Sequence, residues 1–175
     1  RIENVIADGV RFIQPSDNGV VVDRQGITWG SRHLAAEDIP LRGLHNLHNV
    51  ALALTAVAAT IDVNAENQSR VLNAVKTFVP LAHRLETVAT NDGRTWVDDS
   101  LATAPEAVVA ALETYEDQRV TLIAGGEDRG VPWKPLVDYL VDRPSDRKVR
   151  VAAVGPAGAR LAAELAGLDV DVHLC

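Results

Sequence analysis

From residue 105 onward, helices and apolar strands alternate along the chain. The pattern predicts helices over 105–115, 134–141 and 157–166, and strands over 119–124, 149–154 and from Val170. Strands that are apolar along their whole length, with a helix between each pair, are typical of parallel sheets buried on both faces. We therefore expect an α/β fold with a mostly parallel sheet, covered by helices on both sides, in this half of the chain.

The first half of the chain has a different pattern. Short strands are expected over 9–13, 19–23 and 27–29, and the last two suggest a hairpin around Gly26. Apolar residues then recur every three or four positions from Leu47 to Ile61, which predicts a helix. A second helix is expected over 65–78, ended by Pro80.

The pattern changes again at 80–84, and we place a domain boundary there. Two short strands, over 85–90 and 94–98, surround the sequence Asn-Asp-Gly at 91–93, which is a strong hairpin signal. The expected domains are therefore 1–80 and 81–175.

Composition excludes several classes of protein. The net charge of −7 argues against non-specific binding to nucleic acid or to an anionic membrane surface. No apolar run reaches the roughly 18 residues that suggest a membrane span. The single cysteine, Cys175, cannot form an internal disulfide, which fits a reducing compartment. We expect a cytoplasmic protein, and a monomer, that binds neither nucleic acid nor membrane.

The first loop with possible chemistry lies over 98–106, at the carboxyl end of a predicted strand. Thr103 and Glu106 have the spacing of a capping box, so Thr103 is the expected N-cap of the following helix. One interpretation is that the motif only starts a helix. The other is that the helix amides bind an anion while Asp99 accepts hydrogen bonds from hydroxyl groups.

The second loop, over 125–130, reads Gly-Gly-Glu-Asp-Arg-Gly and directly follows an apolar strand. Its glycines allow a close approach of backbone to ligand, and Arg129 could bind a carboxylate with two hydrogen bonds. The alternative is a flexible turn carrying a surface pair between Asp128 and Arg129. No Gly-Lys-Ser/Thr sequence follows, so this loop is not a phosphate-binding P-loop. A third strand-to-helix turn, over 154–158, is interpreted as structural.

Polar residues also gather at the start of the first long helix. Asn46 and Asn49 are three positions apart and share a face, so their amides could bind a base or a ribose. His45 and His48 share a face as well, but no acidic residue or cysteine lies nearby in the sequence, and we expect no metal site. The pair His83-Arg84, at the expected boundary, could be a solvated linker.

Taken together, these stretches resemble the ATP-dependent Mur ligases, and most closely the MurD family. His-Asn-Leu-His-Asn at 45–49 resembles the His-Asn-x-x-Asn helix of that family, and Leu-Ala-His-Arg-Leu-Glu at 81–86 its boundary segment. Asp-Asp-Ser-Leu-Ala-Thr at 98–103 is similar to its Asn-Asp-Ser-Lys-Ala-Thr loop, and Gly125-Gly126 to its Gly-Gly turn. Each motif is weak alone, but four in the same order are specific.

The resemblance implies both a reaction and a domain layout. MurD enzymes add glutamate to UDP-N-acetylmuramoyl-L-alanine in peptidoglycan synthesis, through an acyl phosphate made with ATP and Mg²⁺. By resemblance, 1–80 would be the end of a central ATP-binding domain, and 81–175 a truncated, Rossmann-like domain that binds glutamate.

The resemblance also implies roles for individual residues. The adenine side of ATP would contact Asn46 and Asn49, the ribose would contact Asp99, and the domain junction near the nucleotide would carry His83 and Arg84. The amino-acid substrate would be held by Thr103, Ser100 and Arg129.

Two departures from the family pattern concern the amino acid. Leu101 stands where the family has a lysine, which removes one positive contact to glutamate. In addition, the Asp-Asp-Ser-Leu-Ala-Thr-Ala-Pro-Glu stretch at 98–106 and the Gly-Gly-Glu-Asp-Arg-Gly loop look more like a MurD-related branch that adds L-glutamate. D-glutamate is the default expectation and L-glutamate the alternative.

The phosphate-binding loop, the uridine-nucleotide domain and the metal-binding residues of this family have no counterpart in the 175 residues. We therefore expect no catalytic residue here, and we expect the chain alone to be an inactive fragment. Other interpretations are a folylpolyglutamate-type ligase and a non-catalytic α/β ligand-binding module. A plain NAD-binding domain is disfavoured, because no Gly-x-Gly-x-x-Gly turn is present.

Overall fold

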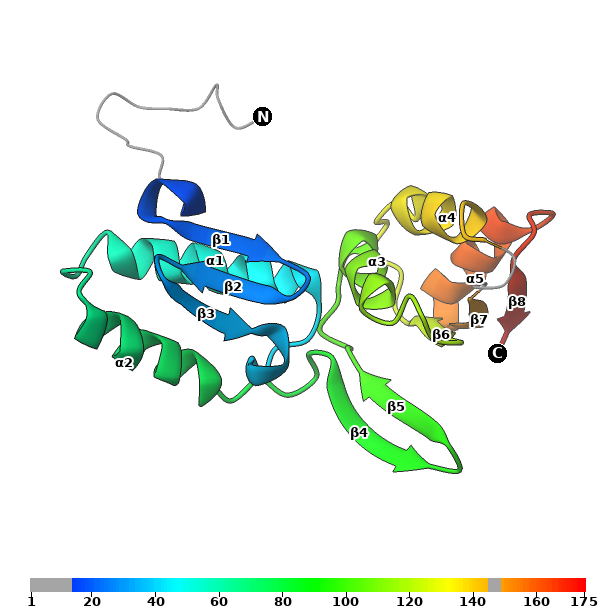
Figure 1. Cartoon of the computed structure of the whole chain (residues 1–175). Helices are drawn as coiled ribbons and strands as arrows, with labels where there is room; N and C mark the ends of the chain where they lie inside the picture. The colour runs from blue at the N-terminus through cyan, green and yellow to red at the C-terminus, as the bar shows by residue number, and fades with distance from the viewer. Residues whose placement is uncertain (1–13, 145–148) are drawn as a thin grey trace, which may run out of the picture. The chain divides into compact units, whose positions relative to one another are not determined.

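The structure, a computed structural model, describes residues 14–144 and 149–175 (Figure 1). The chain divides into two units, Arg1–Pro80 and Leu81–Cys175, and each is described here by itself. The strand expected over 9–13 lies outside the described residues.

The first unit contains a three-stranded antiparallel sheet and two helices. Its elements are β1 (Val20–Asp23), β2 (Gly26–Trp29), β3 (Arg32–Ala35), α1 (Leu44–Ala58) and α2 (Ala65–Lys76), with short 3-10 helices η1 (Pro15–Asn18) and η2 (Ala36–Asp38). The strands are neighbours in the order β1-β2-β3. The β1–β2 hairpin was expected, but β3 was not, because only Leu34 in that strand is a large apolar residue.

One aliphatic core holds the first unit together. The apolar stripe of α1, with Leu47, Val50 and Leu54 at helical spacing, packs with Ile27 and Trp29 of the sheet. The second helix adds Leu72 to the same core. Asn64 is the N-cap of α2, where its side-chain oxygen accepts the Asn67 N–H at 2.9 Å.

The second unit contains a hairpin followed by a parallel sheet with three helices. Its elements are β4 (Glu86–Asn91), β5 (Arg94–Asp98), α3 (Pro105–Thr114), β6 (Thr121–Gly125), α4 (Lys134–Val141), β7 (Arg150–Val154), α5 (Gly155–Leu165) and β8 (Asp171–Leu174). The expected α/β class and parallel sheet are confirmed, and the predicted bounds of the helices and strands agree to within a few residues.

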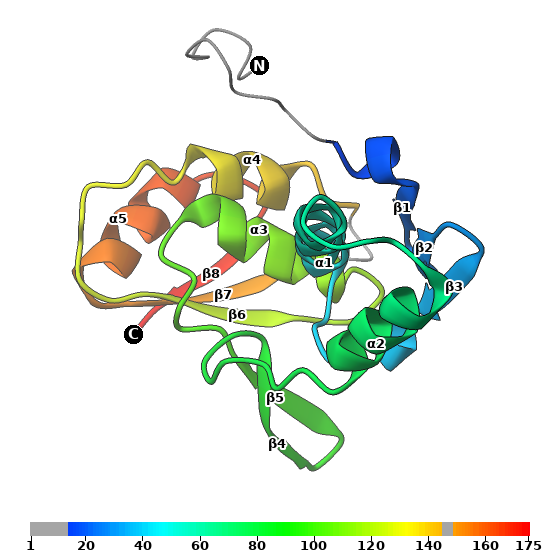
Figure 2. The ribbon, with the colours of Figure 1, turned by 90° about the vertical axis from the view of Figure 1, so that its left-hand side faces the viewer.

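The parallel sheet is covered on one face among the described residues, not on both as expected. Its strands are neighbours in chain order, β6-β7-β8. Because strand–helix–strand connections are right-handed, two successive crossovers in the same direction place α4 and α5 on the same face. Figure 2 shows α3, α4 and α5 together on that side. Ile123 points to the other face and is 60% exposed.

The hairpin β4–β5 forms a sheet of its own, so β5 is not a strand of the parallel sheet. Asp92 and Gly93 both have positive φ, 49° and 72°, as a tight hairpin turn requires. The loop after β5 therefore does not follow a strand of the parallel sheet. The tight turn pairs β5 with β4, so the predicted hairpin is confirmed.

Candidate functional site

The hairpin brings two sequence motifs together at its open end. His83 precedes β4 and Asp98 ends β5, and the His83 Nδ1 atom lies 2.7 Å from Asp98 Oδ2. The backbone follows the same pairing, since the Leu101 N–H donates to the His83 carbonyl at 3.2 Å. The stretch at 81–86 and the loop at 98–103 thus form one structural feature, which we call the hairpin base.

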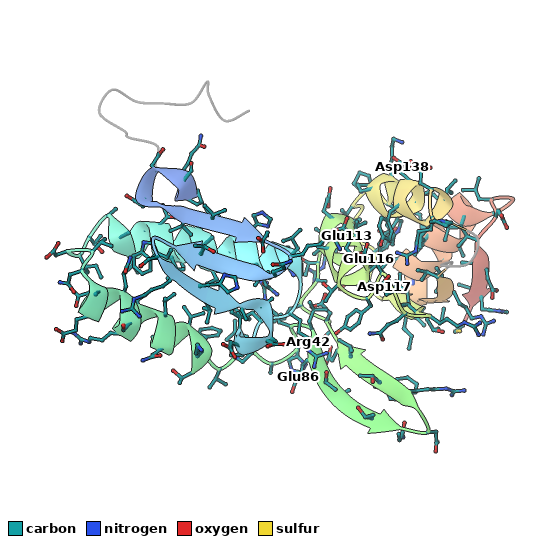
Figure 3. The ribbon with its side chains drawn as sticks, in the orientation of Figure 1. Arg42, Glu86, Glu113, Glu116, Asp117 and Asp138 are labelled. Carbon is teal, nitrogen blue, oxygen red and sulfur yellow. The ribbon has the colours of Figure 1, made fainter. Side chains whose placement is uncertain are left out.

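Two carboxylates hold an unusual backbone in the hairpin base. His83 and Leu85 have φ values of 64° and 46°, in the left-handed region that residues other than glycine seldom adopt. Glu86, at the start of β4 (Figure 3), accepts the His83 N–H at 2.8 Å through Oε2. Asp99 Oδ1 accepts the Leu85 N–H at 3.0 Å. Strain of this kind persists only where the surroundings fix it, so His83 is not a loosely solvated linker residue.

The contact between His83 and Asp98 shifts both titrations. The hydrogen bond and the charge of Asp98 raise the pKa of His83 above its ordinary value of 6.5. The same hydrogen bond, helped by the Ser100 N–H at 2.9 Å, lowers the pKa of Asp98 to about 2. The two groups therefore favour an imidazolium–carboxylate pair.

His83, Glu86 and Asp98 also form a group whose ligand atoms all lie within 4.8 Å of one another. This is the kind of donor set that can hold a cation, although the sequence predicted no metal site. Each donor residue already has a protein partner, since His83 and Asp98 are hydrogen-bonded and Glu86 accepts a backbone N–H. We therefore describe the group as an ion pair with a backbone contact.

The predicted capping box is wrong. The N-cap of α3 is Ala104, one residue later than expected, and no side chain caps the helix. Pro105 explains the difference, because its fixed φ favours the first helical position and holds the preceding residue extended. Thr103 and Ser100 are both exposed on the loop before the helix. One oxygen of the half-buried Asp99 is occupied by Leu85.

The glycine-rich loop after β6 packs against the start of α5. Gly125 has a φ of 135°, and a Cβ there would lie 1.9 Å from the Val154 carbonyl oxygen. The Gly126 N–H donates to that oxygen at 2.8 Å, and the Gly126 carbonyl accepts the Ala157 N–H at 3.0 Å. The turn at 154–158, interpreted as structural, thus supports the loop at 125–130.

The acidic residue of this loop pairs with a residue that the sequence analysis missed. Asp128 accepts two hydrogen bonds from Arg160 of α5, each 2.9 Å long. Arg160 lies 32 positions away, and no local spacing could have indicated the contact. The ion pair of Asp128 is thus with Arg160 and not with Arg129, which is exposed on the loop.

The asparagines of α1 interact with each other. Gly43 is the N-cap, so neither asparagine caps the helix. Asn46 Nδ2 donates to the Arg42 carbonyl at 2.7 Å, and Asn46 Oδ1 accepts from Asn49 Nδ2 at 3.3 Å. The Nδ1 atom of His48 lies 2.9 Å from the Leu44 carbonyl oxygen of its own helix. Asn49 is exposed and its amide is oriented by Asn46.

Comparisons with known proteins show which enzymes the chain resembles. It is 39% identical, over 164 residues, to UDP-N-acetylmuramoyl-L-alanine–L-glutamate ligase of Micromonospora sp., a match that covers 91% of this chain and 35% of the relative. It is 40% identical to UDP-N-acetylmuramoylalanine–D-glutamate ligase of Roseiflexus sp., over 83% of this chain and 30% of the relative. Over most of its length, the chain is similar to MurD-type ligases.

A third MurD relative, UDP-N-acetylmuramoyl-L-alanine–L-glutamate ligase of Salinispora tropica, is 40% identical over 74% of this chain and 28% of its own length. The chain spans about a third of the length of these curated relatives. No protein-family model matches the chain. Among the helices of the part that the structure describes, none has the length and apolar character needed to cross a membrane.

Proposed function

We propose that this chain is the C-terminal part of a longer ATP-dependent ligase that joins glutamate to UDP-N-acetylmuramoyl-L-alanine in peptidoglycan synthesis. The observation that carries the proposal is the sequence identity of 39–40% to MurD-type ligases over most of the chain. On this proposal, residues 1–80 end an ATP-binding domain and residues 81–175 belong to the glutamate-binding domain. The chain alone is then inactive.

We assign two groups of residues to ATP, one in each unit. The amide of Asn49 is exposed and held in place by Asn46, and an oriented amide can pair with the edge of an adenine ring. In the hairpin base, Asp99 uses one oxygen for the Leu85 N–H, which leaves the other to accept a ribose hydroxyl. His83 and Arg84 would lie near the nucleotide.

When bound, ATP with Mg²⁺ would supply the phosphoryl group that activates the substrate carboxylate as an acyl phosphate. The residues of this chain bind and orient, and the metal ligands would lie mostly outside it. We therefore assign no catalytic residue here.

We assign the amino-acid substrate to the two exposed loops of the second unit. Glutamate brings two carboxylates, and a guanidinium such as that of Arg129 can bind one of them with two parallel hydrogen bonds. Thr103 and Ser100 offer hydroxyl groups from the other loop. Leu101, which replaces the family lysine, removes one cation from this site.

We propose L-glutamate as the amino acid that is added. The names of the Micromonospora and Salinispora relatives specify L-glutamate, whereas that of the Roseiflexus relative specifies D-glutamate. The loss of the lysine at position 101 fits a glutamate site different from that of the common D-specific enzymes. A cytoplasmic location and a monomeric state stay predictions.

The test is phosphate release by the full-length protein that contains this sequence. It is supplied with ATP, Mg²⁺ and UDP-N-acetylmuramoyl-L-alanine, and with L-glutamate or D-glutamate in separate reactions. We expect turnover that depends on L-glutamate. Turnover with D-glutamate alone would reverse the assignment of the isomer, and no turnover with either would contradict the proposed ligase.

A further inference from the structure

Arg160 of α5 makes several hydrogen bonds to the glycine-rich loop and to the residue after it, and no sequence pattern predicted them. Its Nε atom donates to Asp128 Oδ2 at 2.9 Å, and its Nη2 atom donates to Asp128 Oδ1 at 2.9 Å. The same Nη2 atom donates to the Val131 carbonyl at 2.7 Å. A planar guanidinium can make this bidentate contact in one orientation only. The contact therefore fixes the geometry of the loop at Asp128 and pairs the Asp128 charge with that of Arg160.

The remaining faces of Arg160 are also occupied. Its guanidinium lies over the ring of Trp133, 5.9 Å from the ring centroid, and Nη1 lies 3.3 Å from Glu164 Oε1. Trp133 is the N-cap residue of α4, the helix that follows the loop. The side chain of Arg160 is only 30% exposed. Arg160 therefore joins α5 to the loop and to the start of α4 at once.

Other hydrogen bonds fix the loop on both sides of Arg129. Asp128 Oδ1 accepts the Gly130 N–H at 2.8 Å, so the residues before and after Arg129 are tied to each other. The start of the loop is tied to the start of α5 through Gly126. The Arg129 side chain is exposed, while the Asp128 carboxylate is held by Arg160.

We propose that Arg160 is a positioning residue for the amino-acid substrate: it holds Asp128 so that the backbone of the loop presents Arg129 to a carboxylate of glutamate. This inference rests on the proposed function and deepens it. Pairing Asp128 with Arg160 also keeps this neighbouring carboxylate from competing with glutamate for Arg129. The lowered pKa of Asp128, caused by the Arg160 hydrogen bonds and then by the Gly130 N–H, agrees with this arrangement.

The test is a double-mutant cycle in the full-length ligase with Arg160→Ala, Arg129→Ala and the double variant. We expect Arg160→Ala to raise the KM for glutamate by about 10-fold to 100-fold, because a small misplacement of a binding group is costly. The KM for ATP should not change, and kcat at saturating glutamate should be largely kept. In the Arg129→Ala background, Arg160→Ala should have little further effect on the KM for glutamate.

Two further variants separate positioning from general stability. Arg160→Lys keeps the charge but not the bidentate contact, so its KM for glutamate should lie between those of the wild type and Arg160→Ala. Arg150→Ala removes an exposed ion pair with Asp171. Both residues begin their strands, at the end of the sheet opposite the glycine-rich loop, so the KM for glutamate should not change. Melting temperatures measured in parallel show whether any variant fails to fold.

The outcomes separate this inference from the proposed function. An unchanged KM for glutamate in a folded Arg160→Ala enzyme would overturn the positioning role of Arg160 and leave the proposed function standing. Equal effects of Arg160→Ala with and without Arg129 would also overturn it, because Arg160 would then act independently of Arg129. A wild-type enzyme without glutamate-dependent turnover would overturn the proposed function, and the role of Arg160 with it.

Discussion

His83 and Asp98 are 15 positions apart in the sequence, and a 2.7 Å hydrogen bond joins their side chains across the base of the β4–β5 hairpin. This contact links the boundary segment to the loop that carries Asp99, Ser100 and Thr103. The position of that loop relative to His83 and Arg84 is therefore set by the hairpin itself. The positions of the residues near the boundary that we assign to ligand binding therefore depend on the contact between His83 and Asp98.

The first prediction concerns the pH dependence of this pair. The pKa of Asp98 is lowered to about 2, so its contribution to stability is complete above the unfolded value of 3.8 and is lost as pH falls through about 2. The pKa of His83 is raised, so its contribution is complete below the unfolded value of 6.5 and is lost as pH rises through the folded pKa. Both contributions are present together between about pH 4 and pH 6.5.

Nuclear magnetic resonance titration of the His83 imidazole checks this directly. We expect a pKa above 6.5 in the wild-type chain and a fall toward 6.5 in Asp98→Asn, because the main cause of the shift is removed. Exposed Asp92, at the tip of the hairpin, provides the control, and Asp92→Asn should leave the His83 titration unchanged. A His83 pKa at or below 6.5 in the wild type would contradict the ion pair.

The second prediction concerns ATP. In the full-length ligase, Asp99→Asn should raise the KM for ATP by about 10-fold to 100-fold, because hydrogen bonds to a charged group contribute about 1.5–3 kcal/mol. The asparagine oxygen can still accept the Leu85 N–H, so the fold should be kept. Steady-state kinetics with varied ATP measures the effect, and Asp92→Asn is the matched control. An unchanged KM for ATP would remove Asp99 from the nucleotide site.

The third prediction concerns the amino acid. Arg129→Ala should raise the KM for glutamate by about 10-fold to 100-fold, since it removes a charged pair of hydrogen bonds to a carboxylate. The KM for ATP should stay the same. Arg119→Ala, a surface change in the same unit, serves as the control in the same kinetic assay. If Arg129→Ala and Arg119→Ala behave alike, Arg129 does not bind glutamate.

The fourth prediction tests the close packing of the glycine-rich loop. A Cβ at Gly126 meets nothing within 4 Å, so Gly126→Ala should cost only the strain of a positive φ, about 1–3 kcal/mol. Gly125→Ala should cost distinctly more, because its Cβ would overlap the Val154 carbonyl oxygen at 1.9 Å. Urea denaturation of the two variants compares their free energies of unfolding. Equal losses of stability would mean that the loop and the start of α5 are not in contact.

Local patterns predicted most of the secondary structure. The helix over 134–141 and the strand over 94–98 were predicted with the bounds of α4 and β5, because proline, glycine and apolar spacing mark them clearly. The Asp92-Gly93 turn was equally clear. By contrast, β3 has one large buried side chain, and its pairing with β2 depends on a neighbour rather than on its own composition.

Long-range relationships account for what the sequence could not predict. The predicted capping box is wrong because Pro105 takes the first helical position of α3, which makes Ala104, and not Thr103, the N-cap. The predicted burial of both sheet faces failed because strand composition does not reveal strand order, and the order β6-β7-β8 places the crossover helices on one side. Arg160 was missed because its partner Asp128 is separated from it by a helix and a strand.

Under the proposed function, this chain is part of an enzyme that forms an amide bond between glutamate and UDP-N-acetylmuramoyl-L-alanine. The most direct measurement is mass spectrometry of the nucleotide-linked product made by the full-length protein from that substrate, ATP and isotope-labelled L-glutamate. We predict one labelled glutamate in each product molecule, formed in a one-to-one ratio with released phosphate. Phosphate release without incorporation of the labelled glutamate would contradict the proposed ligase.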